Sequence, residues 1–136
     1  MKHRLIILAV ITIVLASIFS AMTVAINPRI LFIERIRFLQ GDAVTAGDTL
    51  RAVLEVENEG DKTLYGTSVM LAIPELGIHR RQGRVDMTRG EVTSRDAQLD
   101  IPADTPEGWY MLRVFVSDDD SIVSRKLYRW IYIKFN

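Results

Sequence analysis

The residues best suited to catalysis are one histidine and the charged residues around it. His79 is the single histidine after residue 26, and it stands beside Arg80 and Arg81. These two cations disfavour the protonated imidazole, and no sequence cue places an orienting carboxylate against the ring. Because a nucleophilic triad depends on such geometry, and because the chain has no cysteine, we expect no enzyme activity and no cofactor.

A run of three carboxylates is the only weak candidate for a metal site, and it consists of Asp118, Asp119 and Asp120. Clustered carboxylates on a loop suit Ca²⁺, which takes six to eight oxygen ligands. The run lacks the Asp-x-Asp-x-Asp-Gly order, however, and no second acidic cluster is placed nearby by the sequence. A polar hairpin turn accounts for it more simply. We therefore expect no metal site and keep Ca²⁺ as the less favoured alternative.

An uncharged apolar run, residues 5–26, precedes these residues. Its 22 residues would form a helix of roughly 33 Å, long enough for a hydrocarbon core of about 30 Å. Two interpretations stay open. One is a secretory signal cleaved near Ala25, and the other is an uncleaved signal anchor. Signal peptides usually have a shorter apolar region, so we favour the anchor, with the membrane as a partner of residues 5–26.

The charges that flank this run leave its orientation nearly balanced. Lys2 and Arg4 stand before it, whereas Arg29, Arg35 and Arg37 follow it. We favour a single-pass protein of the cell membrane whose C-terminal domain is extracellular. The division that we expect is a cytoplasmic tail at 1–4, a transmembrane signal anchor at 5–26, a linker at 27–31 and one domain at 32–136.

The charge of the chain after residue 26 excludes one class of partner. That part holds 15 basic and 17 acidic residues, a net charge of −2. Such a balance gives no electrostatic footprint for nucleic acid. The part of the chain after residue 26 also has no cysteine that could form a disulfide, so the domain depends on its hydrophobic core alone.

Alternating apolar and polar residues dominate the sequence after residue 30, with no sustained helical period. Leu50, Ala52, Leu54 and Val56 share one face of a strict period of two. Residues 40–48 are predicted to form a turn. The pattern predicts an all-β fold, an Ig-like antiparallel β-sandwich of about seven strands, after the one N-terminal transmembrane helix. Strands are expected near 32–39, 49–58, 64–74, 77–83, 85–87, 91–101, 109–117 and 123–135.

Two features near the strongest strand concern aromatic residues. Gly108 and Tyr110 open that strand in the manner of a tyrosine corner, although Tyr110 could equally be an ordinary core aromatic. The last strand has large side chains on both faces, and a sandwich needs only one apolar face. We therefore expect an exposed interaction patch. Two alternatives stay open, namely that these aromatics are cross-strand packing pairs or that the N-terminal segment covers them. The members of the patch would be Tyr128, Trp130 and Tyr132 on the last strand, and Trp109 and Phe115 on its neighbour.

A basic segment between residues 79 and 89 is expected to form a loop or a short edge. Its four arginines could contact an acidic polymer, an acidic partner or lipid head groups. They could also simply protect a solvated edge from aggregation. These residues are Arg80, Arg81, Arg84 and Arg89.

Two segments resemble the immunoglobulin-like modules of the CARDB type, which recur in archaeal and bacterial surface proteins. Residues 56–60, VENEG, match the segment that follows the second strand of these modules. Residues 101–114, IPADTPEGWYMLRV, match the segment before the penultimate strand. The resemblance implies an extracellular adhesion, assembly or spacer module. Its motifs are turn signals of the fold and carry no activity.

These observations together predict a membrane-anchored extracellular module for protein–protein interaction, adhesion or cell-envelope assembly. A protein partner or self-association would then occupy the aromatic patch. The alternative is a structural subunit of a multimeric surface or membrane complex, such as a filament or stator-like assembly, joined through the C-terminal strand.

Overall fold

The computed structural model describes residues 30–119 and 124–135, and these residues form eight strands and one short 3₁₀ turn. Their bounds are β1 (Leu31–Phe38), β2 (Ala43–Thr45), β3 (Thr49–Asn58), β4 (Leu64–Ile73), η1 (Pro74–Leu76), β5 (Ile78–Met87), β6 (Val92–Asp100), β7 (Gly108–Ser117) and β8 (Ser124–Lys134). No described helix is long and apolar enough to cross a membrane. The predicted span at 5–26 lies outside the described residues.

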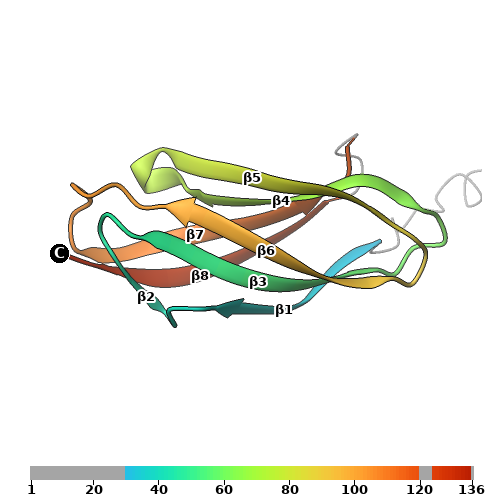
Figure 1. Cartoon of the computed structure of the whole chain (residues 1–136), viewed down its shortest axis with the longest axis horizontal. Helices are drawn as coiled ribbons and strands as arrows, with labels where there is room; N and C mark the ends of the chain where they lie inside the picture. The colour runs from blue at the N-terminus through green and yellow to red at the C-terminus, as the bar shows by residue number, and fades with distance from the viewer. Residues whose placement is uncertain (1–29, 120–123, 136) are drawn as a thin grey trace, which may run out of the picture.

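The strands form two sheets that pack face to face (Figure 1). One sheet has the order β1-β3-β6, and the other has the order β2-β8-β7-β4-β5. All pairs are antiparallel except β2 with β8. The chain crosses between the sheets after β1, so its first strand serves one sheet and β2 the other. The prediction of an all-β fold is confirmed.

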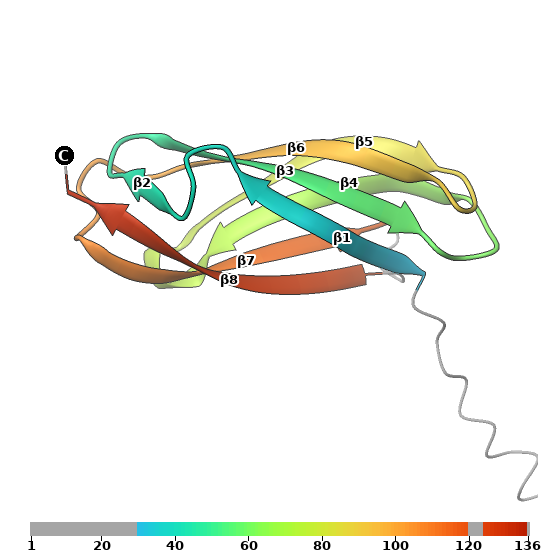
Figure 2. The ribbon, with the colours of Figure 1, turned by 90° about the horizontal axis from the view of Figure 1, so that it is seen from below.

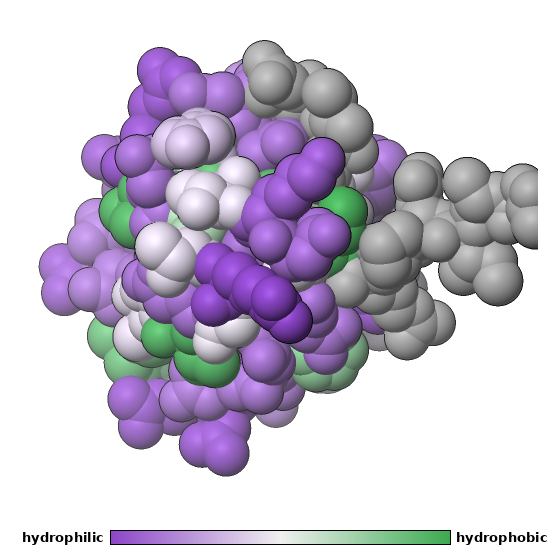
Figure 3. Space-filling view, turned by 90° about the vertical axis from the view of Figure 1, so that its right-hand side faces the viewer, coloured by the Kyte–Doolittle hydropathy of each residue, from purple (hydrophilic) through white to green (hydrophobic). Residues whose placement is uncertain are grey.

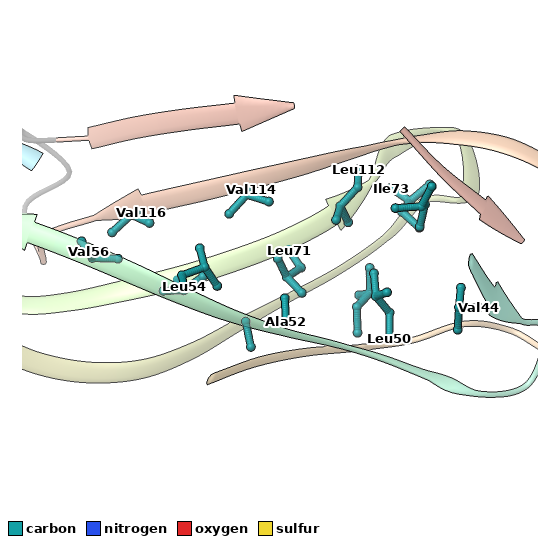
Figure 4. Close-up of a cluster of buried hydrophobic side chains, with 14 of the residues drawn as sticks. Val44, Leu50, Ala52, Leu54, Val56, Leu71, Ile73, Leu112, Val114 and Val116 are labelled. Carbon is teal, nitrogen blue, oxygen red and sulfur yellow. The ribbon is translucent and has the colours of Figure 1, made fainter. Parts of the chain in front are cut away.

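Period-two alternation places one row of apolar side chains of each strand between the sheets. On β3, Leu50, Ala52, Leu54 and Val56 are each at most 1% exposed, as the sequence pattern predicts. They face the inner rows of β4 and β7 from the other sheet (Figure 4). That second row contains Val69, Leu71, Ile73, Leu112, Val114 and Val116.

The basic segment lies mainly on an edge strand, which is one of the two forms expected for it. The predicted pieces 77–83 and 85–87 are one ten-residue edge strand, β5, which pairs with β4 through register shifts. Gly83, with φ +62°, lies within β5 and permits the chain to continue through a position that other residues rarely adopt. Arg80, Arg81 and Arg84 therefore lie on a strand, and Arg89 lies in the turn that follows it.

Three local features also differ from what the sequence pattern predicts. The expected turn at 40–48 contains β2, whose three residues are too few to give a pattern. Tyr65, which a regular period of two would place on the same face as the buried Val69 and Leu71, is 65% exposed. The reason is a register shift between Leu64 and Thr67 around Gly66, where φ is +58°. The first strand begins at Leu31, which is buried, within the segment expected to be a linker.

Candidate interaction surface

Aromatic side chains gather on the outer face of the five-stranded sheet, along β7 and β8. The strand register sets Trp109 opposite Tyr132, and Met111 opposite Trp130. It also sets Arg113 opposite Tyr128 and Phe115 opposite Lys126. We call the five residues Trp109, Phe115, Tyr128, Trp130 and Tyr132 the aromatic face. The structure thus brings together all five residues that the sequence analysis named for this patch.

Most of the aromatic face is open to solvent in the described structure. Trp109 is 62% exposed, Trp130 57% and Tyr128 49%, whereas Phe115 and Tyr132 are half-buried. The rings of Trp109 and Tyr132 lie 5.2 Å apart between centroids, at 58° to one another. Such tilted pairs fix ring positions and contribute about 0.5–1.5 kcal/mol each. Large aromatic rings held in place and still solvated are typical of interaction sites.

Two tyrosines anchor the start of β7 and the end of β8. The Tyr110 hydroxyl donates to the Pro106 carbonyl oxygen at 2.8 Å, four residues upstream, which is the geometry of a tyrosine corner. Gly108 has no steric role here, because an added Cβ would make only ordinary contact. The Tyr132 hydroxyl donates to Glu107 Oε1 at 2.6 Å. This hydrogen bond, with some desolvation and the carboxylate charge, raises the pKa of Tyr132.

Cations stand over aromatic rings at the centre of the same sheet. The guanidinium carbon of Arg113 lies 6.0 Å from the Tyr128 ring centroid, and Lys126 Nζ lies 5.5 Å from that of Phe115. Together with Met70, these four residues line a hollow of about 280 Å³. The surface therefore combines apolar area with positive charge.

The four arginines of the basic segment differ in their partners. Arg80 Nη1 pairs with Asp100 Oδ2 at 3.1 Å, and Arg84 pairs with Asp119. Arg81 Nη1 reaches Ser68 Oγ at 3.5 Å, whereas Arg89 is exposed in the β5–β6 turn. Two of the four are thus already neutralised by carboxylates of the domain.

The acidic run is divided in the structure. Asp118 is largely buried and Asp119 pairs with Arg84, whereas Asp120 lies outside the described residues. Among residues 30–119 and 124–135, no group of three or more His, Asp or Glu side chains could hold a metal ion. His79 is exposed on β5.

Polar side chains join the two sheets along the side where β5 and β6 lie. Gln82 Nε2 donates to the Gln98 carbonyl oxygen at 2.5 Å, and Gln82 Oε1 accepts from the Gln98 backbone nitrogen at 2.8 Å. Arg95, only 7% exposed, donates from Nη2 to the Thr67 carbonyl oxygen at 3.0 Å. Its burial lowers its pKa. Sequence reasoning missed Arg95, because nothing in the pattern distinguishes an arginine that points inward.

Asn58 extends these connections to the end of the same side. It is fully buried, and its Nδ2 donates to the carbonyl oxygens of Lys62, Met87 and Thr88 at 2.8–3.0 Å. Its Oδ1 accepts from the Gly60 backbone nitrogen at 3.0 Å. The resemblance identifies the VENEG segment as a turn signal, and the structure shows that its asparagine also connects β3 to the end of β5.

The opposite side, between β1 and β8, lacks such connections. Among the described residues, no hydrogen bond or ion pair joins β1 to β8, and Leu127 packs there against the core. β2 pairs only with residues 132–134 of β8. Within the part of the chain that the structure describes, residues 124–131 of β8 therefore have β7 as a strand neighbour on one side and no strand on the other (Figure 2).

A scan against models of known protein families finds no match to this sequence, and a search of curated proteins finds none either. Solved structures do match the fold. The crystal structure of the CARDB domain of a Pyrococcus furiosus protein, in complex with di-metal ions, gives a TM-score of 0.56 at 19% identity, covering 76% of this chain and 87% of that one. The solution structure of that domain gives 0.58 at 18% identity, over 79% and 96%. A FixG-related protein from Vibrio parahaemolyticus gives 0.53 at 10% identity, over 78% and 98%.

Identities this low establish the fold alone. The topology, with its tyrosine corner and its crossing first strand, defines an immunoglobulin-like β-sandwich. More narrowly, the described residues have the CARDB-type fold that residues 56–60 and 101–114 resemble in sequence.

Proposed function

We propose that this protein is a membrane-anchored extracellular module that binds a protein partner through the aromatic face. The observation that carries the proposal is the exposure of Trp109, Trp130 and Tyr128 on one sheet face. Exposed clusters of large aromatic residues are costly in water and are typical of binding hot spots. The CARDB-type fold supports an extracellular interaction module.

The position of the aromatic face favours a protein over the lipid surface as its ligand. The chain enters the domain at Ile30, whose carbonyl oxygen accepts from the Glu59 backbone nitrogen at 2.8 Å. Trp109 and Tyr132 lie at the opposite end, about 30 Å away by the length of a ten-residue strand. A domain anchored through residues 5–26 would hold this aromatic pair away from the bilayer. Figure 3 shows the entry end as mainly hydrophilic.

Site-specific cross-linking tests the proposed binding surface. A photoreactive residue replaces Trp130 in the full chain in intact cells, and the control replaces Arg51, which is exposed on the outer face of β3. We expect a discrete protein adduct from position 130 that position 51 does not give. No protein adduct at position 130, or the same adducts at both positions, would reject the proposal.

Protease accessibility tests the topology separately. We expect cleavage of the region 28–136 in intact cells, with no further exposure after lysis. Protection until lysis would place the domain in the cytoplasm and remove the extracellular part of the proposal.

A second candidate, a structural subunit joined through its C-terminal strand, is favoured by the edge of β8 at residues 124–131, which pairs with no described strand. It predicts that the molecular mass of the full chain in detergent rises with protein concentration. A constant monomer mass in light scattering would eliminate this candidate and leave the first in place.

We propose binding rather than catalysis for this domain. His79 is exposed, and its cross-strand neighbour is Ala72. The pairing of Asp119 with Arg84 reduces the charge available to a cation at the acidic run. We therefore propose no metal requirement, although the Pyrococcus furiosus domain was solved with di-metal ions.

A further inference from the structure

The first seven residues of β8 offer a backbone edge for another strand. In an antiparallel strand, the N–H and C=O of one residue point to the same side, and this side alternates along the strand. The Tyr132 backbone nitrogen donates to the Asp42 carbonyl oxygen at 2.9 Å, away from β7. The β7–β8 register runs without a shift, so Lys126, Tyr128 and Trp130 also point their backbone groups away from β7.

This edge is strongly basic. Arg125, Lys126 and Arg129 lie along it, and residues 124–134 contain no acidic residue. None of the three forms an ion pair with another described residue. Arg129 Nη1 instead donates to the Tyr128 carbonyl oxygen at 3.1 Å. This contact covers one of the outward acceptors, as charged residues commonly do at protein edges.

From this edge we infer that the partner supplies an extended, acidic strand, which pairs with residues 124–130 of β8. The inference rests on the proposed function and specifies how the partner is recognised. The added strand would lie on the same side of β8 as β2, which pairs with residues 132–134. Main-chain hydrogen bonds would hold it, and side-chain contacts would select it.

Side-chain positions on both faces of the edge fit such a strand. Lys126, Tyr128 and Trp130 belong to the outer face, whereas Arg125 and Arg129 have the opposite parity. A strand with alternating apolar and acidic residues would therefore set apolar side chains beside Tyr128 and Trp130. Its carboxylates would lie near Arg125 and Arg129 and draw the Arg129 guanidinium from the Tyr128 carbonyl.

A second copy of this chain fits the edge poorly. Pairing β8 with another β8 would bring Arg125, Lys126 and Arg129 of both copies together without any carboxylate on either strand. Like charges opposite one another destabilise strand pairs. An acidic strand has the opposite effect, and this difference makes the proposal testable by charge reversal.

The test fuses the strand to the full chain in detergent. An octapeptide of alternating glutamate and valine follows Asn136 through a 12-residue Gly/Ser linker, whose mean reach of about 20 Å exceeds the roughly 13 Å from Lys134 back to Trp130. The matched control replaces each glutamate with lysine. Tethering raises the effective concentration, so weak pairing is detected.

Amide hydrogen exchange is measured at Lys126, Tyr128 and Trp130. We expect at least tenfold slower exchange in the glutamate fusion than in the lysine fusion, and a smaller difference in high salt. Tyr128→Pro should abolish the protection at residues 126 and 130. It should leave the domain folded, because the lost N–H points away from β7.

Each other outcome rejects strand addition. Equal exchange in the two fusions would mean that charge does not select the strand, and slow exchange that survives Tyr128→Pro would mean that the edge is not used. Protection that rises with concentration in the unfused chain would assign the edge to a second copy. In all three cases, the cross-link at position 130 still tests the proposed function independently.

Discussion

The two long sides of the sandwich differ in how the sheets are joined. Along β5 and β6, Gln82, Arg95 and Asn58 connect one sheet to the other through hydrogen bonds. Along β1 and β8, no hydrogen bond or ion pair joins the described residues, Leu127 packs against the core, and a strand edge has no described partner. The same two sheets therefore have one side held by specific polar contacts and one side free to accept a partner.

This difference indicates that the β5–β6 side contributes mainly to stability and the β8 edge mainly to binding. Polar connections between the sheets require each donor and acceptor to be matched, and a mismatch is costly when buried. Substitutions on the β5–β6 side should therefore reduce stability. Substitutions of outward-facing residues on the β8 edge should change binding and leave stability nearly unchanged.

Among the substitutions on the β5–β6 side, Asn58→Ala should cause the largest loss of stability. The substitution removes all hydrogen bonds of a fully buried side chain, including the one to the buried Met87 carbonyl oxygen and the one from the Gly60 backbone nitrogen. We expect a loss of about 3 kcal/mol in the free energy of unfolding, measured by urea denaturation. A loss below about 1 kcal/mol would show that water replaces the side chain, and that this end of the β5–β6 side is not specifically held.

A smaller effect is expected from Gly83→Ala, with Gly77→Ala as its matched control. Both glycines have nearly equal positive φ, +62° and +65°. A Cβ at Gly83 would lie 2.5 Å from Arg95 Nη2, whereas one at Gly77 meets nothing within 4 Å. We expect losses of about 2 and 1 kcal/mol, the second being backbone strain alone.

Equal losses for the two glycine variants would mean that the Arg95 side chain shifts without cost. The hydrogen bond from Arg95 to the Thr67 carbonyl would then contribute little to the β5–β6 side.

Gln82→Ala should cause the next smaller loss of stability, and Gln98→Ala is its control. The Gln82 side chain bonds the backbone of Gln98, and the Gln98 side chain takes no part in these bonds. We expect Gln82→Ala to cost about 1 kcal/mol and Gln98→Ala to cost less than half of that. The reverse order in thermal unfolding would contradict the assigned bridge.

The smallest effect should be the pH dependence contributed by Glu91 in the β5–β6 turn. Its Oε2 accepts from the Thr88 backbone nitrogen at 2.7 Å and from Thr88 Oγ1 at 2.9 Å, and these bonds lower the pKa of Glu91 from 4.5. A carboxylate with a lowered pKa in the folded state stabilises the fold above its unfolded pKa. This stabilisation is lost as the pH falls through the folded value.

Glu91→Gln should therefore lower the melting temperature slightly at neutral pH and match the parent chain once the pH falls below the lowered pKa of Glu91. Glu75→Gln, on η1, controls for the loss of one negative charge. A constant difference across this pH range would contradict the role assigned to the carboxylate.

The sequence was informative wherever period-two alternation is regular. The inner row of β3 and the outer row of β8 followed from it directly, because a strand alternates its side chains between two faces. The tyrosine corner also followed, since it needs only residues close in sequence, Pro106 and Tyr110.

What could not be predicted depends on contacts between distant residues. Gly66 turns Tyr65 to solvent through a register shift that is set by pairing with β5. Arg95 lies inside because Gly83 and Thr67, from other strands, give it space and an acceptor. Similarly, no local pattern shows that no described strand pairs with this edge of β8 along residues 124–131, because strand order is a property of the whole topology.

The placement of the first and last described strands has a mechanical consequence. The chain enters the domain at one end, before β1, and leaves it at the other, after β8 (Figure 2). Tension between these two points would pull β1 along β3 and β8 along β7, parallel to the strands. The hydrogen bonds of each ladder would then be loaded together in shear rather than opened one at a time. A domain tethered at its N-terminus and held by a partner on β8 would therefore resist force along its length.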